Sequence, residues 1–323
     1  MTDAITRRTF LAGAAAAGAG ALLPGTPGRA DPPVLRRVNG SRPFRFVHLA
    51  DIHVQPERAA DRGFAAALRA VEALRPRPDF ILTGGDLVFD VMEAGPARAR
   101  ELFALYRRVL ADHTALPVRD CLGNHDLFGW RTRAGVTPQT PGYGRALATE
   151  FLRLKSTYYH FDHAGWRFFV LDNIQPGGPR GYQGFLDPPQ REWLAAELRA
   201  TGPQTPIVVV EHIPILTVTP FAYEEMVRDR TWRLQNSLVC SDTPERLPLL
   251  ATRNVRLCLS GHTHQCDRVE YRGTTFVNDG AVSGAWWRGP NRGVEEGFGV
   301  FDLAPDGSIR YEYLDYHWEP PRG

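Results

Sequence analysis

The chain has 323 residues, of which 43% are hydrophobic and 23% charged. This composition is typical of a globular protein with a sizeable core. The formal net charge is only +2, which argues against a protein that binds long nucleic acid, because neutralised phosphates supply most of the affinity there. No linker or internal repeat interrupts the later part of the chain, so we expect one domain over residues 44–316.

The first thirty residues carry a pattern typical of an export signal. Arg7 and Arg8 form a twin-arginine motif, an Ala/Gly/Leu run follows over 11–23, and small residues suited to signal peptidase end at Ala30. A membrane anchor is the alternative, but the run is short and rich in glycine for a spanning helix. We therefore expect a twin-arginine signal peptide over 1–30, a periplasmic or extracellular location, and no stable membrane anchoring after cleavage.

Residues 31–43 are rich in proline and are expected to form a lead-in without regular structure. Removing the signal takes away three arginines and one aspartate, which lowers 38 basic and 36 acidic residues to 35 of each. The mature chain is then formally neutral.

Four cysteines show no C-x-x-C spacing, so a thiolate zinc site is not expected, and disulfide formation stays open. They are Cys121, Cys240, Cys258 and Cys266.

Apolar runs and amphipathic segments alternate in the first part of the domain. The runs 44–50, 80–82 and 117–122 are predicted strands, and apolar residues at helical spacing predict helices over 59–74 and about 96–110. This alternation indicates an α/β fold with a largely parallel sheet, whose functional residues follow the carboxyl ends of the strands.

The second part of the domain is richer in strands. We expect a hairpin over 158–171, a helix over 188–198, and fully buried strands over 206–210 and 255–259. The remaining predicted strands are 268–271, 274–278, 299–303 and 309–314.

Segments without periodicity are expected to be loops near the functional residues. Residues 128–142 suggest a surface loop, and residues 213–242 suggest a cap loop. A third loop carries Trp286 and Trp287, each of which could line a pocket or fill the core.

Polar residues follow five of the predicted strands, at the point where each apolar run ends. Turns and core histidines could explain any single cluster, but five such clusters in succession favour a shared site. Because parallel strands bring their carboxyl ends to one edge of a sheet, we expect these side chains to converge. They are Asp51, His53, Asp86, Asn124, His125, Asp126, His212, His262 and His264.

Carboxylate, imidazole and amide groups without thiolate favour Zn, Fe or Mn over Ca or Mg. About seven ligands exceed what one tetrahedral ion uses. Two ions that share a carboxylate would use them all, and ions about 3.5–4 Å apart suit phosphoryl transfer.

The ordered motifs resemble those of the calcineurin-like metallophosphoesterase family. They are Asp51-x-His53, Gly85-Asp86, Gly123-Asn124-His125-Asp126, His212 and Gly261-His262-Thr263-His264, and they span residues 51–264. Gln190, Trp193 and Leu194, after the strand that ends at Asp172, are similar to the exported, class III cyclic-nucleotide-phosphodiesterase-like branch. The resemblance implies a four-layer α-β-β-α sandwich of two mixed sheets.

The resemblance also implies a role for each residue. Asp51, His53 and His264 would bind the first ion, Asp86 would bridge the ions, and Asn124, His212 and His262 would bind the second. His125 would be the catalytic histidine, which donates a proton to the leaving oxygen or stabilises transition-state charge, and Asp126 would orient it. Such a proton donor is what an alkoxide leaving group needs near neutral pH.

Two differences from the motifs of purple acid phosphatases argue against that branch of the family. Purple acid phosphatases place a tyrosine ligand three residues after the bridging aspartate, where this chain has Phe89, and they have no histidine at the position of His53. That branch is therefore disfavoured. Asp90 has a loose offset from the motif and is left out of the predicted site.

We expect a phosphodiesterase that acts on a small diester, such as a cyclic nucleotide or a glycerophosphodiester. Two Mn, Fe or Zn ions would be its cofactors and a metal-bridging hydroxide its nucleophile. A phosphomonoesterase, or an enzyme acting on nucleotide pyrophosphate bonds, is the alternative on the same site. A non-catalytic metal- or phosphate-binding relative is the alternative of another class, although such a protein would not need His125. The sequence leaves the oligomeric state open.

Overall fold

The computed structural model describes residues 42–131, 135–222 and 226–320, which belong to one structural unit over Leu35–Gly323. The expected export signal over 1–30 and nearly all of the lead-in over 31–43 lie outside the described residues.

The first sheet has five strands in the order β15-β14-β1-β2-β3. β1, β2 and β3 are parallel neighbours, as expected. The C-terminal hairpin then returns to the first strand, so that β14 pairs antiparallel with β1 and β15 antiparallel with β14. The strands are β1 (Phe44–Leu49), β2 (Phe80–Thr83), β3 (Val118–Arg119), β14 (Gly297–Leu303) and β15 (Ile309–Asp315).

The second sheet has six strands in the order β12-β13-β11-β8-β5-β4. Its four inner strands are parallel, and the outer strands β4 and β12 are antiparallel to their neighbours. Both sheets are therefore mixed. The strands are β4 (Tyr159–His163), β5 (Trp166–Val170), β8 (Ile207–Val210), β11 (Val255–Ser260), β12 (Asp267–Tyr271) and β13 (Thr274–Asn278).

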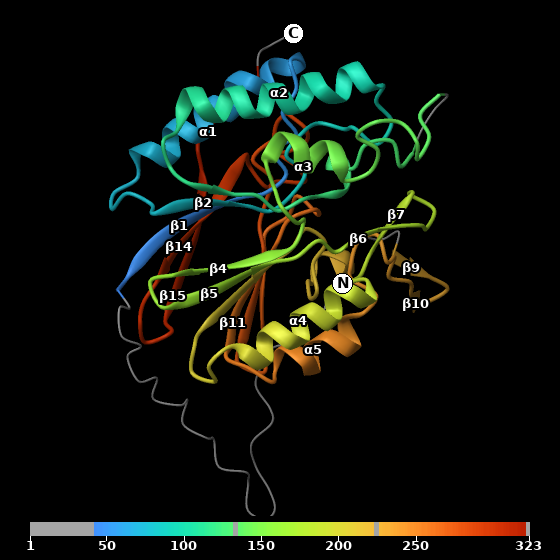
Figure 1. The fold of residues 1–323 in the computed structure, drawn as a ribbon. Coiled ribbons are helices and arrows are strands. Elements are labelled where there is room, and N and C mark those ends of the chain that lie inside the picture. Colours follow the sequence, from blue (N-terminus) through green and yellow to red (C-terminus); the bar gives the residue numbers. More distant parts are fainter. Residues whose placement is uncertain (1–41, 132–134, 223–225, 321–323) are drawn as a thin grey trace, which may run out of the picture. The chain divides into compact units, whose positions relative to one another are not determined.

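Helices cover the outer face of each sheet (Figure 1). α1 (Ala60–Ala73), α2 (Pro96–His113) and α3 (Ala146–Leu152) pack against the first sheet, where they share one hydrophobic cluster with β1. α4 (Pro188–Ala200) and α5 (Thr243–Leu250) pack on the second sheet through another cluster. The expected four-layer α-β-β-α sandwich of two mixed sheets is confirmed.

Aromatic side chains fill the space between the two sheets. Successive residues of β1 point to opposite faces, so Phe44 and Phe46 enter this inner layer, whereas Val47 and Leu49 join the cluster under the helices. The Phe46 ring stacks on Phe80 with centroids 5.3 Å apart and on Phe301 at 5.1 Å. Each buried ring contributes roughly 1.5–3 kcal/mol by leaving water.

Short elements that periodicity did not predict lie mostly outside the segments expected to be loops. α3 and α5 are only seven and eight residues long, and α5 carries Pro248 inside it and buries the charged Arg246. Two short hairpins were also not predicted: β6 (Ile174–Pro176) with β7 (Tyr182–Gly184), and, inside the expected cap loop, β9 (Val227–Arg228) with β10 (Thr231–Trp232). Elements this short carry too few residues to show a period.

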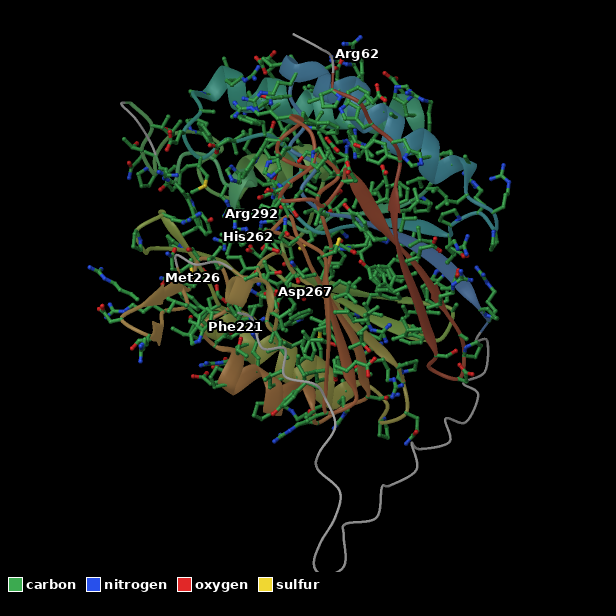
Figure 2. The ribbon with its side chains drawn as sticks, turned by 180° about the vertical axis from the view of Figure 1, so that it is seen from behind. Arg62, Phe221, Met226, His262, Asp267 and Arg292 are labelled. Atoms are coloured by element: carbon green, nitrogen blue, oxygen red, sulfur yellow. The ribbon has the colours of Figure 1, made fainter. Side chains whose placement is uncertain are left out.

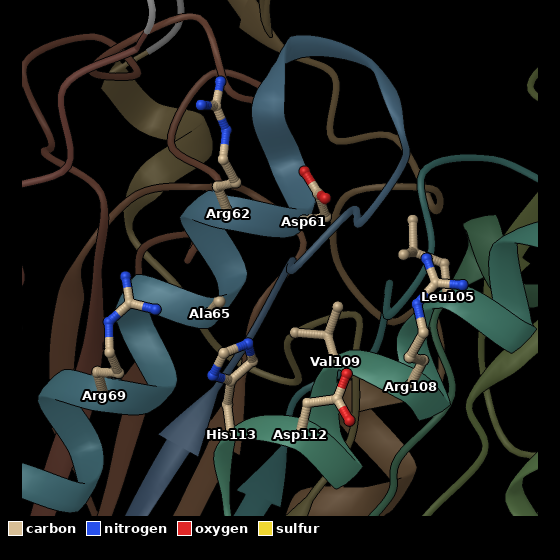
Figure 3. Close-up of a pocket in the computed structure, with 9 residues that line it drawn as sticks. All are labelled: Asp61, Arg62, Ala65, Arg69, Leu105, Arg108, Val109, Asp112 and His113. Atoms are coloured by element: carbon tan, nitrogen blue, oxygen red, sulfur yellow. The ribbon is translucent and has the colours of Figure 1, made fainter.

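A groove of about 360 Å³ lies between α1 and α2, on the outer helix layer. Figure 3 shows that charged side chains line it, among them Arg69 and Asp112. None of its nine lining residues belongs to the predicted site.

All four cysteines are free thiols, and Cys121, Cys240 and Cys258 are buried. No helix within the described ranges combines the length and the apolar character that crossing a membrane requires.

Candidate metal centre

The predicted site residues come from the ends of strands in both sheets. Asp51 and His53 follow β1, and Asp86 follows β2. Asn124, His125 and Asp126 form a single 3-10 turn (η2, Asn124–Asp126) after β3. From the second sheet, His212 follows β8, and His262 and His264 follow β11. Figure 2, which views the protein from behind, labels Arg62 on the outer helix layer and His262 between the helix layers of the two sheets. The site therefore lies where two sheets meet, rather than along the edge of one.

The ligand side chains sit on strained backbone. Left-handed φ angles are costly for residues other than glycine, about 1–3 kcal/mol each, and they cluster at functional sites. Five predicted ligands adopt them: Asp51 (54°), His53 (45°), Asp86 (53°), His262 (73°) and His264 (53°). This concentration supports a functional role for the cluster as a whole.

Two glycines allow the carboxylates to approach the neighbouring backbone. A Cβ on Gly123 would overlap the Asp86 carboxylate, and one on Gly261 would overlap the Asp51 carboxylate. Peptide groups that follow these glycines serve as donors: His125 N–H donates to Asp86 Oδ1 at 2.8 Å, and His262 N–H donates to Asp51 Oδ2 at 2.8 Å.

The side chains gather into two triads. Asp51, His53 and His264 form the first, and Asp86, His212 and His262 form the second. Within each triad, the potential ligand atoms all lie within 4.8 Å of one another. Asn124 adds its Oδ1 to the second triad, 3.1 Å from His212 Nε2.

Asp86 lies between the triads. Its Oδ2 is 3.1 Å from His212 Nε2 in the second triad and 3.6 Å from His53 Nε2 in the first. Burial opposes a charge on this carboxyl, but the neighbouring His212 and His125 hold its pKa well below the usual value. A charged carboxylate in this position can serve both triads.

The four ligand histidines are oriented by backbone carbonyls, each of which accepts from one ring nitrogen and leaves the other for the centre. The carbonyl acceptors are Phe89 for His53 Nδ1 (3.2 Å), Gly284 for His264 Nδ1 (2.6 Å), Gly84 for His212 Nδ1 (2.7 Å) and Ser237 for His262 Nε2 (2.6 Å).

This orientation fits bound cations. His53 Nε2 and His264 Nε2 face each other at 3.2 Å, and burial lowers the pKa of His53 to about 3. When each neutral ring carries its proton on Nδ1, two lone pairs point at each other, and a cation relieves their repulsion. Asp51 Oδ1, buried and without a hydrogen-bond partner, points to the same need.

His125 lies at the rim, with its side chain 25% exposed. Its ring is 5.0 Å from that of His53, and its Nδ1 is 3.4 Å from Asp90 Oδ1. Burial favours a neutral ring, but the charges of Asp86 and Asp90 raise the pKa of His125 to about 9. In the metal-free chain this imidazole carries a proton at neutral pH.

The structure differs from the sequence prediction on which carboxylate orients His125. Asp126 is buried and accepts hydrogen bonds from the N–H groups of Leu87 (2.9 Å), Val88 (3.2 Å) and Gly123 (2.9 Å). Through these hydrogen bonds Asp126 connects the loop after β2 to the η2 turn. The carboxylate beside the His125 ring belongs to Asp90, which the sequence analysis left out.

The two tryptophans have different roles. Trp287 is 1% exposed and its Nε1–H donates to the carbonyls of Ile52 and His53 at 3.1 and 3.0 Å, so it is a core residue that supports the first motif. Trp286 is 39% exposed, and its ring lies 4.6 Å from that of His264 and 5.6 Å from that of His53. Trp286 therefore forms a wall of the site.

Residues 44–266 match the family model described as calcineurin-like phosphoesterase, and the chain belongs to this family. A 3′,5′-cyclic-nucleotide phosphodiesterase of Nostoc sp. (strain PCC 7120) is 26% identical over 239 residues, which cover 71% of this chain and 74% of that relative.

Solved structures of similar fold include a dimetal phosphatase from Danio rerio, with a TM-score of 0.58 and 14% identity over 84% of this chain and 96% of that one. GAP50, the anchor in the inner membrane complex of Plasmodium, has a TM-score of 0.51 and 17% identity over 86% of each chain. At these identities the likeness shows the fold.

Proposed function

We propose that the chain is a metal-dependent hydrolase of phosphoesters whose substrates are small phosphodiesters, such as a cyclic nucleotide or a glycerophosphodiester. The observation that carries this proposal is the pair of adjacent triads, with Asp86 between them and His125 beside them. The relative described as a 3′,5′-cyclic-nucleotide phosphodiesterase supports a diester over a monoester.

In this proposal each triad would hold one ion, Asn124 would add a ligand to the second, and Asp86 would be available to both. The donor set favours Mn, Fe or Zn, because imidazole suits Fe and Zn, carboxylate suits Mn, and neither triad contains a thiolate. When bound, the two ions would activate a water molecule and neutralise charge on the phosphoryl oxygens.

The protein's own groups would complete the reaction. His125 would hold a proton beside the leaving oxygen and donate it as the phosphorus–oxygen bond breaks. Asp90 would keep a proton on Nδ1 of that ring, which leaves Nε2 for the substrate. Trp286 would limit the access of water to the rings of His53 and His264.

The test is hydrolysis of bis(p-nitrophenyl) phosphate against p-nitrophenyl phosphate, on one preparation whose bound metals are measured. Faster cleavage of the diester with about two metals per chain would support the proposal. Faster cleavage of the monoester would make the protein a phosphomonoesterase. Full metal occupancy without activity on either compound would favour a non-catalytic binding protein.

Asp90→Asn is expected to lower kcat by about tenfold, in the range of residues that orient catalytic groups, without changing the metal content. Loss of the Asp90 charge also lowers the pKa of His125, and a proton donor loses activity as pH rises through its pKa. The alkaline limb of the kcat–pH profile should therefore move to lower pH. An unchanged pH profile would mean that Asp90 acts only through the structure.

We further propose that residues 1–30 direct export through the twin-arginine route, which carries folded proteins and would suit a cofactor loaded in the cytoplasm. A reporter fused to residues 1–35 should appear outside the cytoplasm, and replacing Arg7 and Arg8 by lysine should retain it inside. A reporter that stays cytoplasmic with the native arginines would contradict export.

A further inference from the structure

A second cavity opens beside His125 and has a volume of about 270 Å³. This is slightly less than the roughly 300–1,000 Å³ of pockets that hold a whole small ligand. The cavity is therefore suited to one half of a small substrate. Its lining residues are Arg58, Phe89, Asp90, His125, Trp286 and Arg288.

Two arginines give this cavity a positive charge that the protein does not neutralise by a direct ion pair. Among the described residues, neither Arg58 nor Arg288 has a carboxylate within salt-bridge distance. Arg58 Nη1 donates to the Trp286 carbonyl at 3.1 Å, and its guanidinium lies 5.5 Å from the centre of the Phe89 ring. Burial and the charge of Arg288 together lower the pKa of Arg58. Two neighbouring guanidinium groups in this state are suited to binding an anion.

The cavity is lined by one carboxylate, that of Asp90, and it does not pair with the two arginines. Asp90 Oδ1 faces His125 Nδ1 at 3.4 Å, and Asp90 also accepts from the Met92 N–H at 2.8 Å. Its charge is thus directed at the histidine and the backbone.

An aromatic wall connects the cavity to the first triad. Trp286 packs against the rings of His264 and His53 and keeps 39% of its surface exposed. Both Trp286 (φ 53°) and Arg58 (φ 56°) have left-handed backbone, and the hydrogen bond between them ties the two strained segments together. A flat, exposed indole held in this way can stack on a nucleobase.

We propose that this cavity binds the leaving half of a phosphodiester that carries a second, terminal phosphate, with Arg58 and Arg288 holding that phosphate and Trp286 stacking on the base. The substrate class is then a short linear nucleotide diester with a 5′-phosphate. This inference rests on the proposed function. A cyclic mononucleotide has a single phosphate, which would lie at the metal centre. It therefore offers no second anion to the two arginines.

The reaction is an ordinary hydrolysis. Water attacks the phosphorus of the internal diester, the bond between phosphorus and the 3′ oxygen breaks, and the 3′ oxygen receives a proton. The other proton of the water is released. From a 5′-phosphorylated dinucleotide, the products are two nucleoside 5′-monophosphates, and no further reactant is consumed.

Adenylyl-(3′→5′)-adenosine and its 5′-phosphorylated form provide a matched pair that differs in the terminal phosphate alone. We expect kcat/KM to be about tenfold higher for the phosphorylated dinucleotide, the effect of one charge-assisted contact. Arg288→Gln and Arg58→Gln should each reduce this preference to about twofold or less. Arg69→Gln, in the groove between α1 and α2 (Figure 3), is the matched control and should keep the full preference.

Equal kcat/KM for the two dinucleotides, or a preference that survives in both arginine variants, would overturn the inference. Cleavage of bis(p-nitrophenyl) phosphate without cleavage of either dinucleotide would also overturn it while leaving the proposed function intact. If a fully metallated preparation cleaves no phosphoester at all, the proposed function fails and the inference fails with it.

Discussion

Replacing Asp86 by alanine is expected to remove the bound metal and abolish hydrolysis together. Asp86 is the carboxylate that approaches histidines of both triads, at 3.1 and 3.6 Å. Without it, the first site keeps Asp51 and two imidazoles and the second keeps its imidazoles and Asn124, but both lose the carboxylate that the two ions would share. The metal content should fall from about two ions per chain to below one, and turnover should fall to that of the metal-free protein.

The measurement is metal analysis by mass spectrometry alongside the diester assay. Asp86→Asn tests the same point with a side chain of equal size, in case the alanine variant folds poorly. Asp112→Ala, on α2 and away from the site, is the control and should keep both metal and activity. A fully metallated Asp86→Ala protein would contradict the assignment of Asp86 as a shared ligand.

Replacing His125 by alanine should have the opposite pattern, with metal retained and turnover lost. His125 lies beside the triads without belonging to either. Removing a general acid costs about 10²–10⁴-fold in rate. The loss should be larger for diesters with an alkoxide leaving group than for bis(p-nitrophenyl) phosphate, because p-nitrophenolate leaves readily without a proton.

This dependence on the leaving group separates proton donation from a structural effect. His317→Ala is the control, because that side chain is 86% exposed. Two results would argue against a proton donor at His125. One is loss of metal from His125→Ala, and the other is an equal loss of rate for both kinds of leaving group.

The strand-end clusters could be predicted because apolar runs and the polar residues that follow them are adjacent in the chain. The predicted boundaries of strands such as β8 and β11 differ from the observed ones by a single residue. The pairing of β1 with β14 could not be predicted in this way, because it joins residues about 250 positions apart. From the residues alone, one parallel-rich sheet was expected to gather the site, whereas both sheets contribute to it.

The contacts of the side chains around the site could not be predicted from the sequence. An aspartate is usually exposed, but Asp120, just before the third motif, is buried and accepts a hydrogen bond from the Tyr106 hydroxyl at 2.6 Å. Asp126 is next to His125 in the chain and Asp90 is far from it, yet the path of the backbone places Asp90 beside the ring and turns Asp126 toward peptide N–H groups. Arg58 and Arg288 could not be singled out from the sequence, because nearly all basic residues of this chain are arginines.

The origin of the ligands in both sheets determines when the chain can first hold an ion. Asp51, His53, Asp86 and Asn124 are synthesised in the first half of the chain, but each triad needs histidines beyond residue 211. Neither triad is complete until the strand before His264 has joined its sheet. Metal acquisition would thus have to wait until most of the chain is made, and a chain truncated before His262 should lack both complete triads.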